Sequence, residues 1–181
     1  MGTPVRILGI DPGSRITGWG VIETIGPHGR KYRHVANGCL RLGGGEFSQR
    51  LRSLFEGLQA LVADHAPHEV ALEDVFLNKN PMSALKLGQA RGAAMAAVAC
   101  LDLPVHAYTP AKVKQSIVGN GRADKTQVNH MVQVLLNLTK APQADAADAL
   151  GIAISHAHWR ASPASRLEAM IAKADAKAAR A

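Results

Sequence analysis

Hydrophobic residues in the first part of the chain come in short runs separated by glycine and proline, a spacing typical of strands joined by turns. Three such runs cover residues 5–10, 18–22 and 35–42. Because the connections between them are short, they predict three antiparallel strands that follow one another along a sheet.

From residue 47 onward the hydrophobic period changes to three and four residues, which predicts an amphipathic helix. Pro67 follows the expected end of this helix, as proline commonly does. We expect the helix to lay one face on the sheet. Its apolar positions are Leu51, Leu54, Phe55, Leu58, Leu61 and Val62.

The rest of the chain alternates between the two patterns, with strands expected at 70–75 and 104–108 and helices at 83–101, 124–138 and 143–159. Thr109 followed by Pro110 predicts the start of a further helix. A strand, helix, strand series predicts parallel pairing, because a crossover helix returns the chain to the same end of the sheet. We therefore expect an α/β domain over residues 1–159 and a flexible tail over residues 160–181.

Composition supports a folded domain, since 47% of the 181 residues are hydrophobic and 19% are charged. The two cysteines, Cys39 and Cys100, lie in apolar surroundings without metal-ligand spacing, so we interpret both as small core residues in a reducing cytosol. No apolar run approaches the roughly 20 residues that a membrane helix needs, and the N-terminus shows no secretion signal. We expect a cytoplasmic protein with no membrane contact.

Charge narrows the choice of partner. Lys and Arg number 21 and Asp and Glu number 14, which gives a net charge of +7. Such an excess favours a polyanion, with nucleic acid the leading candidate. Many soluble proteins carry a similar excess without binding nucleic acid, so charge alone leaves both interpretations open.

Four acidic residues interrupt otherwise apolar stretches. Asp11 ends the first strand, Glu73 lies in the fourth strand, and Asp145 and Asp148 are three residues apart on one helix face. If the fold brings them together, their charges repel one another unless divalent cations neutralise them. A site with only oxygen ligands indicates Mg²⁺ or Mn²⁺.

Each acid also has an ordinary structural explanation. Asp11 precedes Pro12 and Gly13, where aspartate is a common turn residue. Glu73 could face solvent from its strand. Asp145 and Asp148 follow a proline at a helix start, where the helix dipole favours acids. The occurrence of all four in one basic α/β chain is what favours a functional site.

Four stretches closely resemble the RuvC-type Holliday junction resolvases of the ribonuclease H-like superfamily. They are "GIDPGSRITGWGVI", "LEDVF" followed by "SALKLGQARG", "KQSIVGNGRADKTQV" and "PQADAADALGIAISH". The resemblance runs from about residue 8 to about residue 157. A lone Asp-x-Gly after a strand also occurs in actin-like and sugar-kinase ATPases, but the other three stretches do not fit those proteins.

This resemblance implies a ribonuclease H-like fold with a five-stranded mixed sheet, the first three strands antiparallel, flanked by helices. It implies a homodimer that cuts four-way junction DNA by paired symmetric nicks, leaving 5′-phosphate and 3′-hydroxyl ends. Asp11, Glu73, Asp145 and Asp148 match the catalytic acids that hold two Mg²⁺ ions, for which Mn²⁺ could substitute. The RuvA and RuvB branch-migration proteins are implied partners.

The same resemblance implies three DNA contacts. Lys114 and Lys125 match basic positions near the scissile phosphate, and Phe76 matches an aromatic residue that stacks on an unpaired base at the junction. Surface lysines are usually only solvated, and Phe76 follows an apolar strand, so a core role is its alternative.

Two other functions remain open from the sequence. One is a ribonuclease of the same fold that cuts RNA in a hybrid duplex. The other is a junction-binding module without activity, which the four intact acids argue against. Cleavage of junction DNA and of an RNA–DNA hybrid, with and without Mg²⁺, separates these functions.

Overall fold

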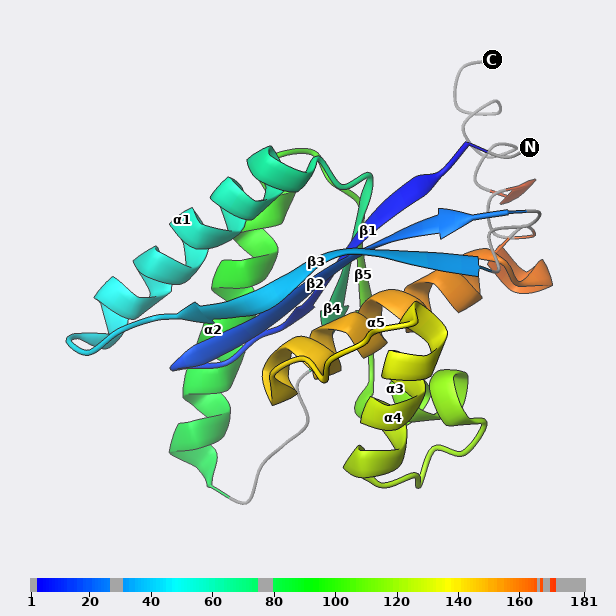
Figure 1. Ribbon diagram of the computed structural model, residues 1–181. Helices are drawn as coiled ribbons and strands as arrows, with labels where there is room; N and C mark the ends of the chain where they lie inside the picture. Colours follow the sequence, from blue (N-terminus) through cyan, green and yellow to red (C-terminus); the bar gives the residue numbers. More distant parts are fainter. Residues whose placement is uncertain (1–2, 27–30, 75–79, 166, 168–169, 172–181) are drawn as a thin grey trace, which may run out of the picture.

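A five-stranded mixed sheet forms the centre of the molecule, with the strand order β3-β2-β1-β4-β5 (Figure 1). The computed structural model describes residues 3–26, 31–74, 80–165, 167 and 170–171. The strands are β1 (Val5–Asp11), β2 (Ile16–Ile25), β3 (Lys31–Arg41), β4 (Glu69–Glu73) and β5 (Val105–Tyr108). β1, β2 and β3 pair antiparallel, whereas β4 pairs parallel with β1 and β5. The predicted sheet, with its first three strands antiparallel, is confirmed.

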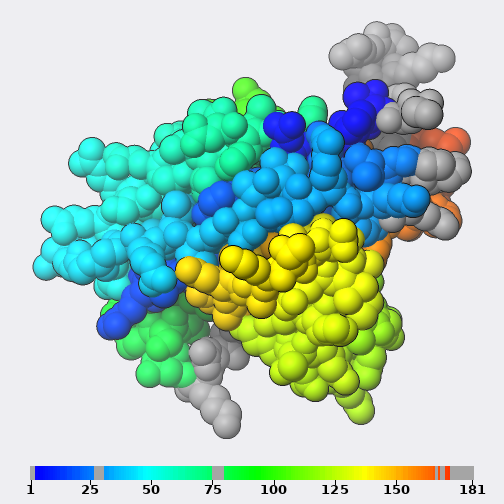
Figure 2. All heavy atoms as spheres, viewed as in Figure 1, coloured from blue at the N-terminus to red at the C-terminus, as the bar shows by residue number. Residues whose placement is uncertain are grey.

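Helices cover both faces of this sheet (Figure 1). They are α1 (Phe47–His65), α2 (Pro81–Ala99), α3 (Pro110–Val118), α4 (Lys125–Leu136) and α5 (Ala144–Arg160). α1 and α2 share one hydrophobic cluster with the sheet, and α3, α4 and α5 share the other. The space-filling view shows α3 and α4, in green to yellow, below β3 (Figure 2). The layers are therefore helix pair, sheet, then α5 with α3 and α4.

The apolar spacing that predicts α1 also explains how it packs. Leu54, Leu58 and Leu61 are buried and lie in one cluster with Leu8 and Val21 of the sheet. Because these leucines recur every three or four residues, they line one face of the helix. The expectation that α1 lays one face on the sheet is confirmed.

Local caps fix the starts of α3 and α4. The Thr109 hydroxyl accepts a hydrogen bond from the Lys112 amide, and Pro110 occupies the first turn. Asp124 caps α4, and the Gln127 side chain completes a reciprocal capping box. The predicted start of α3 is confirmed, and α4 begins one residue after its predicted first residue because Asp124 is the cap.

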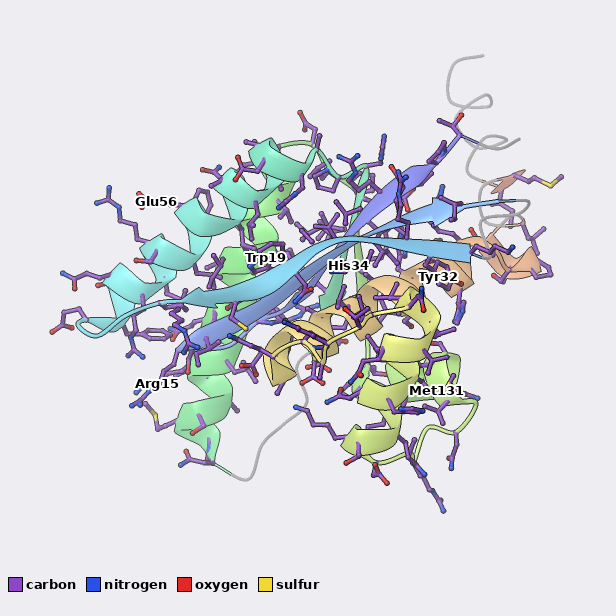
Figure 3. The ribbon with its side chains drawn as sticks, in the orientation of Figure 1. Arg15, Trp19, Tyr32, His34, Glu56 and Met131 are labelled. Atoms are coloured by element: carbon purple, nitrogen blue, oxygen red, sulfur yellow. The ribbon has the colours of Figure 1, made fainter. Side chains whose placement is uncertain are left out.

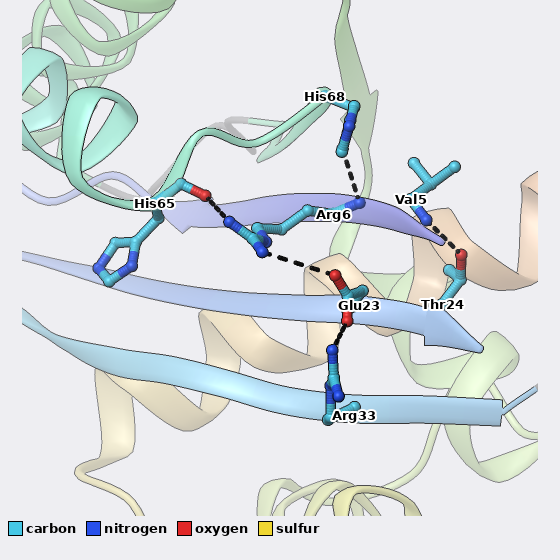
Figure 4. A network of polar contacts seen from close by, with 7 residues as sticks. All are labelled: Val5, Arg6, Glu23, Thr24, Arg33, His65 and His68. Carbon is cyan, nitrogen blue, oxygen red and sulfur yellow. Dashed lines mark hydrogen bonds and ion pairs between the residues drawn. The ribbon is translucent and has the colours of Figure 1, made fainter. Parts of the chain in front are cut away.

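A polar network ties the first three strands to the end of α1 (Figure 4). Arg6 donates to the His65 carbonyl and lies 3.5 Å from Glu23. Arg33 of β3 forms a second ion pair with Glu23, whose side chain is 9% exposed. Pairing with two arginines compensates this largely buried carboxylate for its lost hydration.

Three sequence expectations need correction. Cys100 is exposed and Cys39 is only half-buried, so neither is the core residue that we predicted. Cys100 caps the C-terminus of α2, where the chain turns away from the core. β2 extends beyond the predicted 18–22 at both ends. β3 begins before the predicted residue 35, because backbone pairing continues through exposed polar positions such as Lys31 and Arg33, and it ends at Arg41.

No helix in the described part of the chain is both long and apolar enough to cross a membrane. Residues 163–165, just after α5, are helical. The flexibility predicted for residues 160–181 stays a prediction.

Candidate active site

Glycines in β1 and β2 let α5 lie directly on the sheet. A Cβ atom at Gly9 would come within 2.1 Å of the Ala149 carbonyl oxygen, and one at Gly18 within 1.9 Å of the Asp145 carbonyl oxygen. Any larger side chain at these positions would lift the helix. The missing side chains therefore bring the first turns of α5 down onto the strands.

Three of the predicted acids meet where α5 crosses the end of β1. Asp11 is the last residue of β1 and pairs with Gly18 of β2. Carboxylate oxygens of Asp11, Asp145 and Asp148 all lie within 4.8 Å of one another. The spacing of Asp145 and Asp148 along one helix face is what allows both to reach Asp11.

Glu73 joins the same cluster from β4. β1 and β4 are parallel neighbours with Ile10 in register with Leu72, so Asp11 and Glu73 follow as the next residues of their strands. The Glu73 and Asp11 side chains are hydrogen-bonded to each other. The structure thus brings together all four acids that the sequence singled out.

Burial and the charges of neighbouring acids raise the pKa of Asp11, Glu73 and Asp148. Burial is the largest cause for Asp11, whose pKa rises to about 8, and the charges of Glu73 and Asp148 raise it further. Burial also raises the pKa of Glu73 and of Asp148. Without a cation and below a pH of about 8, Asp11 is protonated and is the donor in its hydrogen bond to Glu73, because two adjacent, partly buried carboxylates resist ionising together.

Two lysines face the acids from α3 and α4. The Lys125 ammonium donates a 2.6 Å hydrogen bond to Asp148, which raises the pKa of Lys125. Burial keeps the pKa of Glu73 and of Asp148 raised, and the positive charge of Lys114 offsets part of this rise. Glu73, Lys114, Lys125 and Asp148 line a common pocket. The structure therefore places both predicted lysines beside the acids.

Phe76, the predicted stacking residue, lies outside the described residues. Its role stays a prediction.

Sequence reasoning missed an arginine that holds the end of β4. The Arg91 side chain donates to the Glu73 carbonyl over 3.1 Å and forms a 3.2 Å ion pair with Asp74. Arg91 lies within the quoted stretch "SALKLGQARG" of α2. In the sequence it is one of two charged residues of that helix, with Lys86, and nothing there distinguishes it from a solvated surface charge.

A second polar cluster at the opposite end of β4 was also missed. His156 is fully buried, lies 2.6 Å from Glu69 and is hydrogen-bonded to the Tyr108 hydroxyl over 2.7 Å. Arg160 pairs with the same Glu69 carboxylate. Burial opposes ionisation of Glu69, but the His156 hydrogen bond and the Arg160 charge outweigh it, and the pKa of Glu69 is lowered. These contacts fasten α5 to β4 and β5.

Comparison with known sequences gives a consistent match. The family model "Crossover junction endodeoxyribonuclease RuvC" matches residues 7–156. A protein of that name from Marinobacter nauticus is 53% identical over 156 residues, which cover 86% of this chain and 87% of that protein. Another from Alkalilimnicola ehrlichii is 55% identical over 153 residues, 84% of this chain and 91% of that protein.

Solved structures agree with these sequence matches. Thermus thermophilus RuvC in complex with a Holliday junction substrate superimposes with a TM-score of 0.79 at 32% identity, covering 86% of this chain and 94% of that one. The yeast mitochondrial Holliday junction resolvase Ydc2 shares the fold with a TM-score of 0.63 at 15% identity, over 87% and 81% of the two chains. The predicted ribonuclease H-like fold is confirmed, and the chain belongs to the RuvC family of crossover junction endodeoxyribonucleases.

Proposed function

We propose that this protein is a Mg²⁺-dependent, structure-selective endonuclease that resolves Holliday junctions by paired symmetric nicks. One observation carries the proposal: Asp11, Glu73 and the Asp145/Asp148 pair converge from three separate elements beside two lysines. Converging carboxylates that are partly buried are costly for folding, and a divalent-metal site accounts for them. The names of the relatives support the junction as substrate.

The donor atoms fit Mg²⁺. Asp11, Glu73, Asp145 and Asp148 offer only carboxylate oxygens, the ligands that hard cations prefer. Burial, and after it the neighbouring negative charges, raise the pKa values of Asp11, Glu73 and Asp148, and a divalent cation would stabilise their ionised forms. We infer two Mg²⁺ ions per site, with Mn²⁺ as a possible substitute. When bound, they supply an activated water and neutralise charge on the leaving oxygen.

The remaining residues of the site would hold the DNA strand. Lys114 and Lys125, on the open side of the acids, would contact the phosphate oxygens and offset their charge. Water attacks phosphorus, the bond to the 3′ oxygen breaks, and that oxygen takes up a proton. The products are a 5′-phosphate and a 3′-hydroxyl. Phe76 would stack on an unpaired base at the junction.

A homodimer would supply the second cut, and α2 offers a surface for it. Met82 and Leu85 are each more than half exposed, and Leu101 just after the helix is exposed as well. A Cβ atom at Gly88 or Gly92 would meet no other atom within 4 Å. An exposed apolar helix with small residues favours close packing against a second copy. We further propose cooperation with RuvA and RuvB in the cytoplasm.

A junction-cleavage assay tests this function. We expect the protein to nick a synthetic four-way junction in the presence of Mg²⁺ and to stop when the metal is chelated. Linear duplex DNA and an RNA–DNA hybrid serve as control substrates. Cleavage of the hybrid in preference to the junction would identify a ribonuclease, and junction binding without metal-dependent cleavage would identify a binding module.

A further inference from the structure

Two arginines lie on the other side of the acids from Lys114 and Lys125. Arg41 is the last residue of β3 and pairs with Ile16, the first residue of β2. Arg15 directly precedes Ile16 in the chain. Both arginines are exposed. Figure 3 shows Arg15 at the end of the sheet where α5 begins. These two guanidinium groups and the two lysines therefore flank the acids from opposite sides.

Strand alternation places Arg41 on the face that carries the acids. Asp11 pairs with Gly18, and Gly18 pairs with Cys39, so these three residues form one row across three strands. The Cys39 thiol accepts a hydrogen bond from the Ala146 backbone of α5. Arg41, two residues farther along β3, points to the same face.

The turn that carries Arg15 is held from two directions. The Leu42 amide donates to the Arg15 carbonyl over 3.0 Å. Arg50 of α1 donates to the Ser14 carbonyl over 3.0 Å, and its guanidinium lies 5.2 Å from the centre of the Phe47 ring. The backbone of Arg15 is thus fixed beside the site while its side chain extends into solvent.

Neither charge has a partner among the residues that the structure describes. In the described part of the chain, Arg15 and Arg41 form no ion pair and their guanidinium groups form no hydrogen bond. The other arginines near this end of the sheet, Arg50 and Arg91, both bond to protein carbonyls. Exposed guanidinium groups that have no partner among the described residues, beside a nuclease centre, suit phosphate oxygens.

We propose that Arg15 and Arg41 bind the DNA backbone beside the scissile phosphate, opposite Lys114 and Lys125. This inference rests on the proposed function. Two strand spacings and two residues along β3 separate the α-carbons of Arg41 and Asp11 by about 12 Å. Since one strand of DNA advances about 3.4 Å per nucleotide, the contacted phosphates lie about two to four nucleotides from the cut.

Salt dependence of junction binding tests the contact. Arg15→Ala and Arg41→Ala should each flatten the plot of log affinity against log salt by about 0.9, the value for one lost phosphate contact. Arg41→Lys keeps the charge and should keep the wild-type slope. Lys31→Ala is the matched control, because Lys31 is exposed at the opposite end of the same strand. Unchanged slopes for both arginine variants, or an equal fall for Lys31→Ala, would overturn the proposal.

Replacing one phosphate by an uncharged analogue then locates the contact that Arg41 makes. We expect wild-type protein to bind a junction with a single methylphosphonate about two to four nucleotides from the cut more weakly than it binds the natural junction. Arg41→Ala should bind the two junctions equally well. Equal weakening for both proteins would show that Arg41 does not contact that region. Wild-type protein is tested for junction cleavage in the same assay. If it cleaves the junction but the arginine variants bind like wild type, the proposed function stands and the arginine contact is wrong.

Discussion

Gly18 lies directly beneath Asp145, so close that a Cβ atom on Gly18 would come within 1.9 Å of the Asp145 carbonyl oxygen. Gly18 is also the strand partner of Asp11. Because Gly18 has no side chain, α5 lies close enough to the sheet for Asp145 to meet Asp11.

Replacing Gly18 by alanine should push the first turn of α5 away from β2. We expect overpacking to cost about 1–3 kcal/mol of the free energy of unfolding, measured by urea denaturation. A displacement of about 1 Å can lower a rate about 100-fold, so junction cleavage should fall by that order. Gly44→Ala is the control, because a Cβ atom there would meet nothing within 4 Å. Wild-type cleavage by Gly18→Ala would contradict this account.

The sequence predicted the acids better than the contacts that hold them. Asp11, Glu73, Asp145 and Asp148 stood out because each interrupts an apolar stretch. Gly18 did not, because a glycine in a strand has no property that reveals which helix will lie above it. That information depends on pairing across the sheet, which residue spacing alone does not give.

The start of β3 and the C-terminal end of α2 also could not be predicted from residue spacing. Polar residues such as Lys31 and Arg33 hid the start of β3, since they face solvent from a strand at the edge of the sheet. Cys100 looked like a core residue because of its apolar neighbours, but it lies at a helix terminus and is exposed. Arg91 could be recognised as important only once its contact with Glu73 was visible.

Stability without metal should depend on pH through Asp11. The pKa of this carboxyl rises from 3.8 to about 8 in the folded protein, so the folded state binds more protons than the unfolded state between these values. The contribution of Asp11 to stability is therefore greatest below its unfolded pKa of 3.8 and is lost as the pH rises toward about 8. Asp11→Asn cannot ionise, so its melting temperature should exceed that of wild type by a margin that grows over this range. A constant margin across the range would contradict the raised pKa.

Binding of Mg²⁺ should release the proton that Asp11 holds. The released proton makes the apparent affinity for Mg²⁺ increase with pH until about 8, where Asp11 is ionised without metal. Calorimetric titrations at pH 7 in buffers of different ionisation enthalpy measure this proton release. Asp11→Asn should show weak binding and little release. Heats that do not depend on the buffer would show that no proton leaves.

Arg91 should act by positioning Glu73. Arg91→Ala removes the donor to the Glu73 carbonyl and the partner of Asp74. We expect the Mg²⁺ concentration for half-maximal cleavage to rise and the maximal rate to fall about 10-fold or more. Junction affinity without metal should change little, and Arg91→Lys should recover part of the activity. Arg52→Ala, which removes an exposed ion pair with Glu56 on α1, is the control.

Mixed dimers test whether resolution needs two complete sites. One cluster of four acids can promote cleavage at one phosphate at a time, and a two-fold symmetric dimer would place a second cluster against the opposite strand. Dimers of one wild-type and one Asp11→Asn chain should therefore bind junctions and nick one strand. They should rarely release two nicked duplexes.

A supercoiled plasmid with an extruded cruciform separates these outcomes, because the first nick relaxes the plasmid and the junction is then lost. In the proposed mechanism wild-type dimers make both cuts before that happens, and we expect them to produce linear DNA. Mixed dimers, lacking the second set of acids, should accumulate nicked circles instead. Linear DNA formed by mixed dimers as fast as by wild type would mean that one active site makes both cuts, and the symmetric mechanism would then be wrong.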